Sequence, residues 1–114
     1  MTLSLLFEFL LAFPLLALSL TLHEFAHGWV AERCGDSTAR IEGRLSLNPL
    51  VHMDLWGTFL LPIFFILTFH TPFGWAKPVP VNFMNLHRPR SQMIWVAVAG
   101  PIANILLAAF FAAF

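Results

Sequence analysis

The sequence predicts an all-α membrane protein with about three transmembrane helices and a short β-hairpin or extended loop between the first two. Of its 114 residues, 59% are hydrophobic and only 11% are charged. Soluble domains carry about 25% charged residues, so these few charges could not cover a water-soluble protein of this size. Three apolar stretches reach the roughly 20 residues that a helix needs to cross a bilayer. We therefore expect a multi-pass protein of the cell membrane, with residues 1–114 in a single domain.

The first predicted span covers about residues 3–33. Pro14 lies inside it and is tolerated in a membrane helix, because neighbouring helices can satisfy the carbonyl that a proline frees. Gly35 then signals the end of the helix. The apolar run leads into His23 and not into a cleavage site of small residues, so we interpret it as a retained span and not as a signal peptide.

The second and third predicted spans cover about residues 55–75 and 93–114. Neither contains a charged side chain. Trp56, Trp75 and Trp95 lie near the ends of these two stretches, where indole rings favour the interface between lipid and water.

The two linkers differ in pattern. In the first, Ile41, Leu45 and Leu47 alternate with polar residues around Gly43, which predicts a β-hairpin or an extended loop. In the second, two prolines within residues 77–82 exclude a helix and predict an extended segment.

The charges exclude some functions and leave the orientation open. The net charge is zero and the six basic residues are scattered, so the chain has no footprint for nucleic acid. The lone Cys34 excludes an internal disulfide. A count of positive charges does not orient the chain, because each linker carries three of them. These residues are Arg33, Arg40 and Arg44 in the first linker and Lys77, Arg88 and Arg90 in the second.

The motif His23-Glu24-Phe25-Ala26-His27 ends the most apolar part of the first span. Histidines four residues apart lie on one face of a helix, so both imidazoles can reach one Zn²⁺ ion. A glutamate directly after the first histidine is the general base of zinc peptidases. Ionisable groups at membrane depth are costly and by default functional. We therefore predict His23 and His27 as metal ligands and Glu24 as the catalytic base.

The residues alone leave the metal site incomplete, because catalytic zinc usually has three protein ligands. Asp36 lies nine residues beyond His27 and reaches the metal only if the chain folds back. His52 and Asp54 could do so from the following loop, although nothing in the spacing requires it. Cys34 is too far along the helix and fits better as a small buried residue.

Five segments in this order resemble the site-2 protease family of intramembrane zinc metalloproteases (M50 type). The resemblance covers most of the chain from Leu20 onward. Within the family, the chain is similar to the compact bacterial-type branch, which lacks an inserted PDZ domain. The matching segments are His-Glu-Phe-Ala-His-Gly (23–28), Gly-Arg-Leu-Ser-Leu-Asn-Pro (43–49), His-Met-Asp (52–54), Gly-Trp-Ala-Lys-Pro-Val-Pro-Val-Asn (74–82) and Ala-Gly-Pro-Ile-Ala-Asn (99–104).

The resemblance implies a zinc-dependent endopeptidase that cleaves transmembrane segments of other membrane proteins within the lipid bilayer. It implies zinc ligation by His23 and His27 and a base at Glu24. The family's third ligand is an aspartate in an Asp-Gly motif on a later helix, which these 114 residues do not contain. We therefore expect a C-terminally truncated, partial peptidase domain that is inactive by itself.

Other interpretations stay open at this point. The chain could be a catalytically inactive membrane pseudoprotease that binds a membrane partner, or a zinc transporter. Two histidines on one helix face cannot ligate both faces of a haem, which argues against a haem protein. Asn104 could orient either the substrate or the zinc site, and residues 74–82 could line the substrate entrance or form an interfacial loop. The sequence does not define the oligomeric state.

Overall fold

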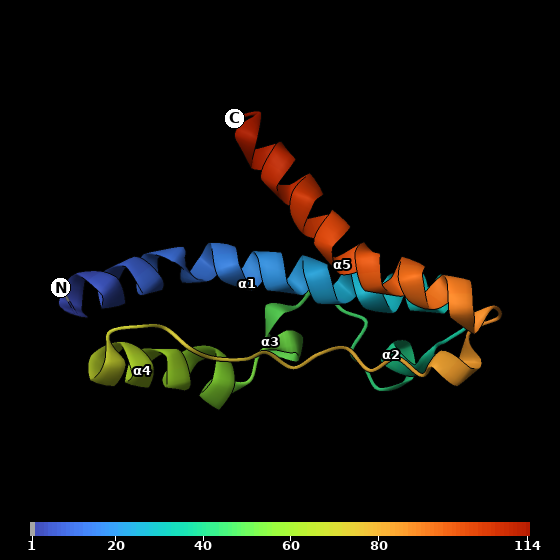
Figure 1. The fold of residues 1–114 in the computed structure, drawn as a ribbon, viewed down its shortest axis with the longest axis horizontal. Coiled ribbons are helices and arrows are strands. Elements are labelled where there is room, and N and C mark those ends of the chain that lie inside the picture. The colour runs from blue at the N-terminus through green and yellow to red at the C-terminus, as the bar shows by residue number, and fades with distance from the viewer. Residues whose placement is uncertain (1) are drawn as a thin grey trace.

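The computed structural model describes residues 2–114, and every regular element within them is a helix (Figure 1). The two long helices, the first and the last, share the largest interhelical contact. Short helices and a long non-helical segment lie along the first of them. In chain order the elements are α1 (Thr2–Arg33), α2 (Thr38–Ile41), α3 (Pro49–His52), the π-helix η1 (Leu55–Leu60), α4 (Leu61–Phe69), the 3-10 helix η2 (Phe83–Asn85) and α5 (Pro89–Ala112).

Helices α1 and α5 are the two that are long and apolar enough to cross a membrane, judged by length and composition. The 32 residues of α1 extend about 48 Å at 1.5 Å per residue, which exceeds the roughly 30 Å of a hydrocarbon core. The first half of α5 lies against the second half of α1 and runs in the opposite direction (Figure 1). Near its middle α5 turns away from α1, because Pro101 removes a backbone donor and its ring crowds the preceding turn.

The predicted β-hairpin between the first two spans is wrong, since no strand forms in residues 2–114. The alternation around Gly43 arises from a short helix and the turn that ends it. Gly43 has a positive φ of 70°, and Arg44 N–H bonds back to the Ala39 carbonyl at 2.7 Å, which closes α2. Ala39 is buried against Gly28 of α1, whereas Ile41 is exposed. The backbone N–H and carbonyl groups that a hairpin would have paired between strands thus form hydrogen bonds within a local turn.

The predicted second span over residues 55–75 is also wrong in length. Helical structure there runs from Leu55 to Phe69, and His70 ends it in the left-handed conformation with a φ of 59°. Fifteen helical residues extend only about 22 Å, which is short of a hydrocarbon core. Among the described residues there are therefore two helices of spanning length and not three.

After α4 the chain returns along α1 as a non-helical segment, residues 72–82, here called the thread (Figure 1). The absence of helix there agrees with its two prolines. Trp75 anchors its start: its backbone N–H donates to the Gly57 carbonyl at 2.8 Å and its carbonyl accepts from Thr58 at 2.7 Å. A Cβ on Gly57 would lie 2.3 Å from the Trp75 ring, so only glycine permits this approach.

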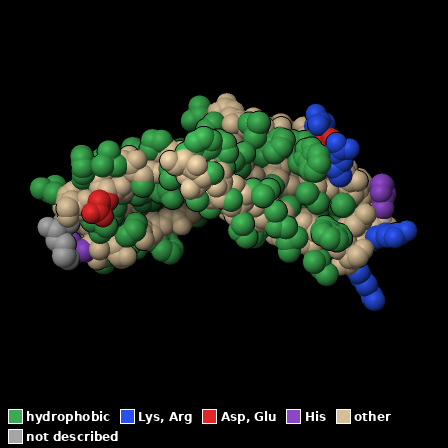
Figure 2. Space-filling model, turned by 90° about the horizontal axis from the view of Figure 1, so that it is seen from above, with side chains coloured by type: hydrophobic (Ala, Val, Ile, Leu, Met, Phe, Trp, Pro, Cys, Tyr) green, Lys and Arg blue, Asp and Glu red, His purple; other side chains and the backbone are tan. Residues whose placement is uncertain are grey.

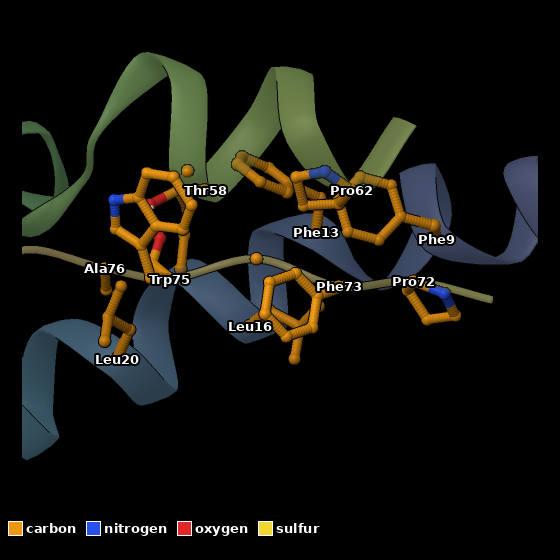
Figure 3. Close-up of a pocket in the computed structure, with 13 residues that line it drawn as sticks. Phe9, Phe13, Leu16, Leu20, Thr58, Pro62, Pro72, Phe73, Trp75 and Ala76 are labelled. Atoms are coloured by element: carbon orange, nitrogen blue, oxygen red, sulfur yellow. Dashed lines mark hydrogen bonds between the residues drawn. The ribbon is translucent and has the colours of Figure 1, made fainter. Parts of the chain in front are cut away.

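An apolar cavity of about 410 Å³ lies where the start of the thread, α4 and α1 meet. Figure 3 shows Trp75 and Thr58 facing one another, with Phe13, Leu16 and Pro62 along the walls. The cavity is bounded almost entirely by carbon atoms, because the polar groups of the thread bond to η1 and not into the space.

Four of the six basic residues, two from each linker, come to the end of the molecule where α1 finishes and α5 begins. His87 N–H donates to the Cys34 carbonyl at 2.9 Å, which joins the start of α5 to the end of α1. On the face seen in Figure 2, Lys and Arg side chains gather at this end and hydrophobic side chains cover the middle. The tie in the count of positive charges assumed that the linkers lie on opposite sides. This assumption does not hold, because α4 is too short to cross a membrane and the thread returns along α1. Arg33, Arg40, Arg88 and Arg90 therefore lie at one end.

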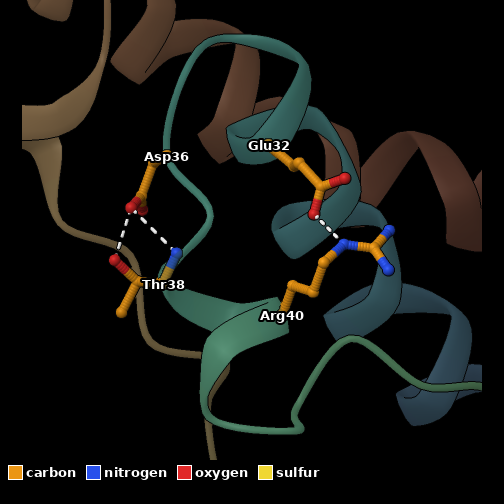
Figure 4. Close-up of polar contacts among 4 residues, drawn as sticks. All are labelled: Glu32, Asp36, Thr38 and Arg40. Carbon is orange, nitrogen blue, oxygen red and sulfur yellow. Dashed lines mark hydrogen bonds and ion pairs between the residues drawn. The ribbon is translucent and has the colours of Figure 1, made fainter.

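Asp36 fastens the far end of the thread to the end of α1. Its side chain is 1% exposed and accepts hydrogen bonds from Thr38 N–H at 3.1 Å and from the Thr38 hydroxyl (Figure 4). It also accepts from Asn82 N–H at 2.7 Å and from the Asn85 amide at 3.0 Å. Burial raises the pKa of Asp36, but bonds from Thr38, Asn85 and Asn82 outweigh it and hold the pKa below its ordinary value. A neighbouring ion pair, Arg40–Glu32 at 2.6 Å, lies on the surface.

We expect Asp36→Asn to destabilise the fold by about 1–3 kcal/mol, because an amide places a donor where the carboxylate accepts from Asn82 and Asn85. A carboxyl whose pKa is lower in the folded than in the unfolded chain stabilises the fold at pH values above its unfolded pKa of 3.8. This stabilisation is lost as the pH falls through the pKa of the folded state. The difference in unfolding temperature between wild type and variant should therefore be largest near neutral pH and shrink below about pH 4. Glu42→Gln, on an exposed side chain, is the control; a difference independent of pH would contradict the assignment.

Candidate metal site

His23 and His27 lie one turn apart on α1, on the side that faces α5. Their rings meet edge to face with centroids 4.6 Å apart. The two Nε2 atoms are 3.0 Å from each other. Both imidazoles therefore lie on one face of the helix, as the spacing of the two histidines predicts.

Helix α5 binds the opposite nitrogen of each ring. His27 Nδ1 lies 2.6 Å from the Val96 carbonyl oxygen, and His23 Nδ1 lies 2.6 Å from Asn104 Oδ1. Carbonyl and amide oxygens only accept, so each Nδ1 carries a hydrogen and donates it. In the neutral rings both Nε2 atoms therefore carry a lone pair and no hydrogen. Hydrogen bonds at Nδ1 that orient the ring are the usual support of histidines that bind metal.

The residues present fit two ligands of a zinc ion. Two neutral imidazoles cannot hydrogen bond through two unprotonated Nε2 atoms, so their close approach calls for a shared cation or proton. Zinc–nitrogen bonds of about 2.0–2.1 Å in a tetrahedral site separate two nitrogens by roughly 3.3 Å, close to the 3.0 Å observed. Gly100 supplies the room: a Cβ there would lie 2.5 Å from His27 Nε2 and 2.7 Å from His23 Nε2.

Glu24 stands beside the pair. One carboxylate oxygen, Oε2, accepts from the Val79 backbone N–H of the thread at 2.9 Å. A cavity of about 310 Å³ adjoins it, and its walls are Leu16, Ser19, Leu20, His23, Glu24 and Asn104. Glu24 and His23 thus face the same open space, which adjoins the larger apolar cavity along Leu16 and Leu20.

The other sequence candidates for a third ligand are engaged elsewhere. Asp36 holds the end of the thread, as described above. Asp54 accepts from the Trp75 ring N–H at 2.9 Å, and fully buried His52 donates from Nε2 to the Ser46 carbonyl at 2.7 Å. Cys34 is half-buried and packs against the apolar core cluster of Ala31, Leu86 and Val96. Within residues 2–114 no group of three or more His, Cys, Asp or Glu side chains could hold a metal ion.

Several contacts at the site carry no signal in the sequence. Val79 N–H reaches Glu24 from 55 residues away. Arg44 supports this part of the thread by donating from one Nη2 to the Lys77 and Pro78 carbonyls, each at 3.1 Å. Val96 acts through its backbone carbonyl, which every residue type possesses. Asn104 could be suspected from the sequence, but only its contacts show what it bonds.

The chain has two helices of membrane-spanning length and two histidines whose Nε2 atoms lie close together. Comparison with known proteins points to the same kind of protein. The model of peptidase family M50 matches residues 11–114. The chain is 44% identical over 93 residues to "Putative zinc metalloprotease YwhC" of Bacillus subtilis (strain 168). It is 36% identical over 92 residues to "Putative zinc metalloprotease Rip2" of Mycolicibacterium smegmatis (strain ATCC 700084 / mc(2)155).

The chain therefore belongs to peptidase family M50, the site-2 protease family of zinc metalloproteases. The two matches cover 82% and 80% of this chain but only 39% and 34% of the relatives' own length. No solved structure was found to match it.

We expect Gly100→Ala to weaken zinc binding by at least about tenfold, because the added methyl occupies the space against both Nε2 atoms. Alanine favours a helix over glycine by about 1 kcal/mol, so lost helix propensity cannot explain such a result. Zinc content and metal titration of the complete protein in detergent measure the effect. Ala108→Ser, which adds one atom to an exposed position of α5, is the control. Unchanged zinc binding by Gly100→Ala would place the ion elsewhere.

Proposed function

We propose that this chain is the part of a zinc-dependent intramembrane endopeptidase that holds two metal ligands, His23 and His27, and the catalytic base, Glu24. Its substrates would be transmembrane segments of other membrane proteins. One observation carries the proposal: α5 fixes the hydrogen of both rings on Nδ1 and so leaves two Nε2 lone pairs 3.0 Å apart. A histidine pair without a metal would need a shared proton between the two Nε2 atoms.

Each residue has a chemical task in the proposed reaction. When bound, zinc would polarise the peptide carbonyl and acidify the attacking water. Glu24 accepts the proton of that water during attack and passes it to the leaving nitrogen. The Val79 amide holds one carboxylate oxygen, so Glu24 is kept beside the cavity and the other oxygen is left for the proton. The cavity itself admits the peptide.

The depth of the site supports a reaction inside the bilayer. At 1.5 Å per residue, His27 lies about 9 Å and His23 about 15 Å along α1 from Arg33. Arg33 is the last residue of α1 and lies at the basic end, beside the start of α5, where the helix would leave the hydrocarbon. The site is therefore within the apolar layer and near one surface, where water can enter and an apolar substrate helix can approach.

The apolar cavity between the thread, α4 and α1 suits a substrate of this class. It adjoins the cavity of Glu24, and aromatic and aliphatic side chains line it. A soluble peptide would lose hydration there without gaining polar contacts. A transmembrane segment, which is rich in large apolar side chains, would bury them favourably.

Glu24→Gln should keep the zinc and lose cleavage of a transmembrane reporter by roughly 10²–10⁴-fold, because glutamine retains the acceptor for Val79 but cannot take a proton. His23→Ala should lose both zinc and cleavage. The complete protein, reconstituted with the reporter and assayed for cleavage and zinc content, provides the measurement, with Glu42→Gln as the control. Cleavage by Glu24→Gln at the wild-type rate would remove Glu24 from the mechanism.

The shared basic end predicts the orientation of a multi-pass protein. Cytoplasmic segments carry the excess of Lys and Arg, so the end where α1 finishes and α5 begins should face the cytoplasm. In a Cys34→Ala background, Glu42→Cys should react with a membrane-impermeant maleimide only after cells are permeabilised. Leu3→Cys, at the exposed opposite end of α1, should react in intact spheroplasts. The reverse labelling pattern would refute this orientation.

A further inference from the structure

The amide of Asn104 has a single orientation that its partners can satisfy. Its Nδ2 lies 3.0 Å from the Ser19 backbone carbonyl and 2.6 Å from the Ser19 hydroxyl oxygen. A carbonyl oxygen only accepts, so the nitrogen of the amide must face Ser19. Its oxygen must therefore face His23, where it accepts from Nδ1 at 2.6 Å.

These bonds use the donors of the Asn104 amide. Nδ2 donates to the backbone carbonyl and to the hydroxyl oxygen of Ser19, and Oδ1 accepts from His23. A side chain that bound a substrate carbonyl would need an amide hydrogen directed into the cavity. Both hydrogen bonds of Asn104 Nδ2 go to Ser19 and not into the cavity beside Glu24, although Asn104 lines that cavity.

The bonds also form a closed ring between two helices. Ser19 precedes His23 by four residues and so lies one turn away on the same face of α1. The ring runs from Ser19 to Asn104 on α5 and back to His23 on α1. His27, in contrast, is held by the backbone of Val96, which no substitution removes. Of the two histidines, only His23 has its Nδ1 hydrogen held by a side chain of α5, that of Asn104.

We infer that Asn104, held in place by Ser19, is a positioning residue that keeps the His23 hydrogen on Nδ1 and so makes Nε2 a metal ligand, and that it does not bind the substrate. This inference rests on the proposed function. It adds that metal affinity depends on the docking of α5, a helix that contributes no ligand among the described residues. Loss of a partner that orients a metal-binding histidine lowers metal affinity by roughly 10–100-fold.

Titration of the complete protein in detergent with Co²⁺, read from its visible absorption bands, tests the inference. Asn104→Leu should weaken Co²⁺ binding roughly 10–100-fold and alter the bands, because His23 loses its acceptor. Asn104→Asp keeps an acceptor for His23 and should bind Co²⁺ more tightly than the leucine variant. Ser19→Ala leaves the backbone carbonyl as an acceptor and should change affinity by only a few fold.

The outcomes separate this inference from the proposed function. Wild-type Co²⁺ affinity and bands in Asn104→Leu, with cleavage lost, would overturn the positioning role and make Asn104 a substrate contact. Equal affinity in the folded aspartate and leucine variants would also overturn it. If wild-type protein binds no metal, or His23→Ala binds it unchanged, the proposed function itself fails. Thermal unfolding and tryptophan fluorescence of each variant show which ones are folded.

Discussion

The site depends on the docking of α5 against α1 through two hydrogen bonds to histidine nitrogens. Val96 and Asn104 accept the Nδ1 hydrogens of His27 and His23, and Gly100, between them on α5, leaves room beside both Nε2 atoms. One helix thus carries the two candidate ligands and the other determines whether they can bind an ion. In lipid, the interhelical contact gains little from apolar burial, so small residues and polar bonds must supply its specificity.

The thread holds Glu24, the candidate catalytic base, in a similar way. Its start is anchored by Trp75 on η1, its middle by Arg44 and its end by Asp36. Between these anchors Val79 presents its backbone N–H to Glu24. A non-helical backbone at membrane depth is tolerated where protein surrounds it and satisfies its polar groups. These anchors provide such partners, and as a consequence a mobile carboxylate is held beside the cavity.

The sequence predicted the local geometry of the candidate site better than the fold around it. The motif of His23, Glu24 and His27 specified its own geometry, because a helix of 3.6 residues per turn places the fourth residue over the first. The alternation around Gly43 misled, since Leu45 is half-buried whereas Ile41 and Leu47 are exposed, and apolar residues spaced in this way resemble a strand when their partners are unknown. The uncharged stretch after Leu55 misled as well, because composition does not show that His70 ends the helix after fifteen residues.

By itself, then, the amino-acid order determined a membrane-embedded helical chain, a pair of imidazoles on one helix face and an adjacent carboxylate. These are local properties of composition and of helical period. Tertiary structure decided which ring nitrogen keeps its hydrogen, which space stays open for an ion and which end collects the positive charge. Those features arise from contacts between positions such as 23 and 104 or 27 and 96, 81 and 69 residues apart. No periodicity links such distant positions, so only the folded chain could bring them together.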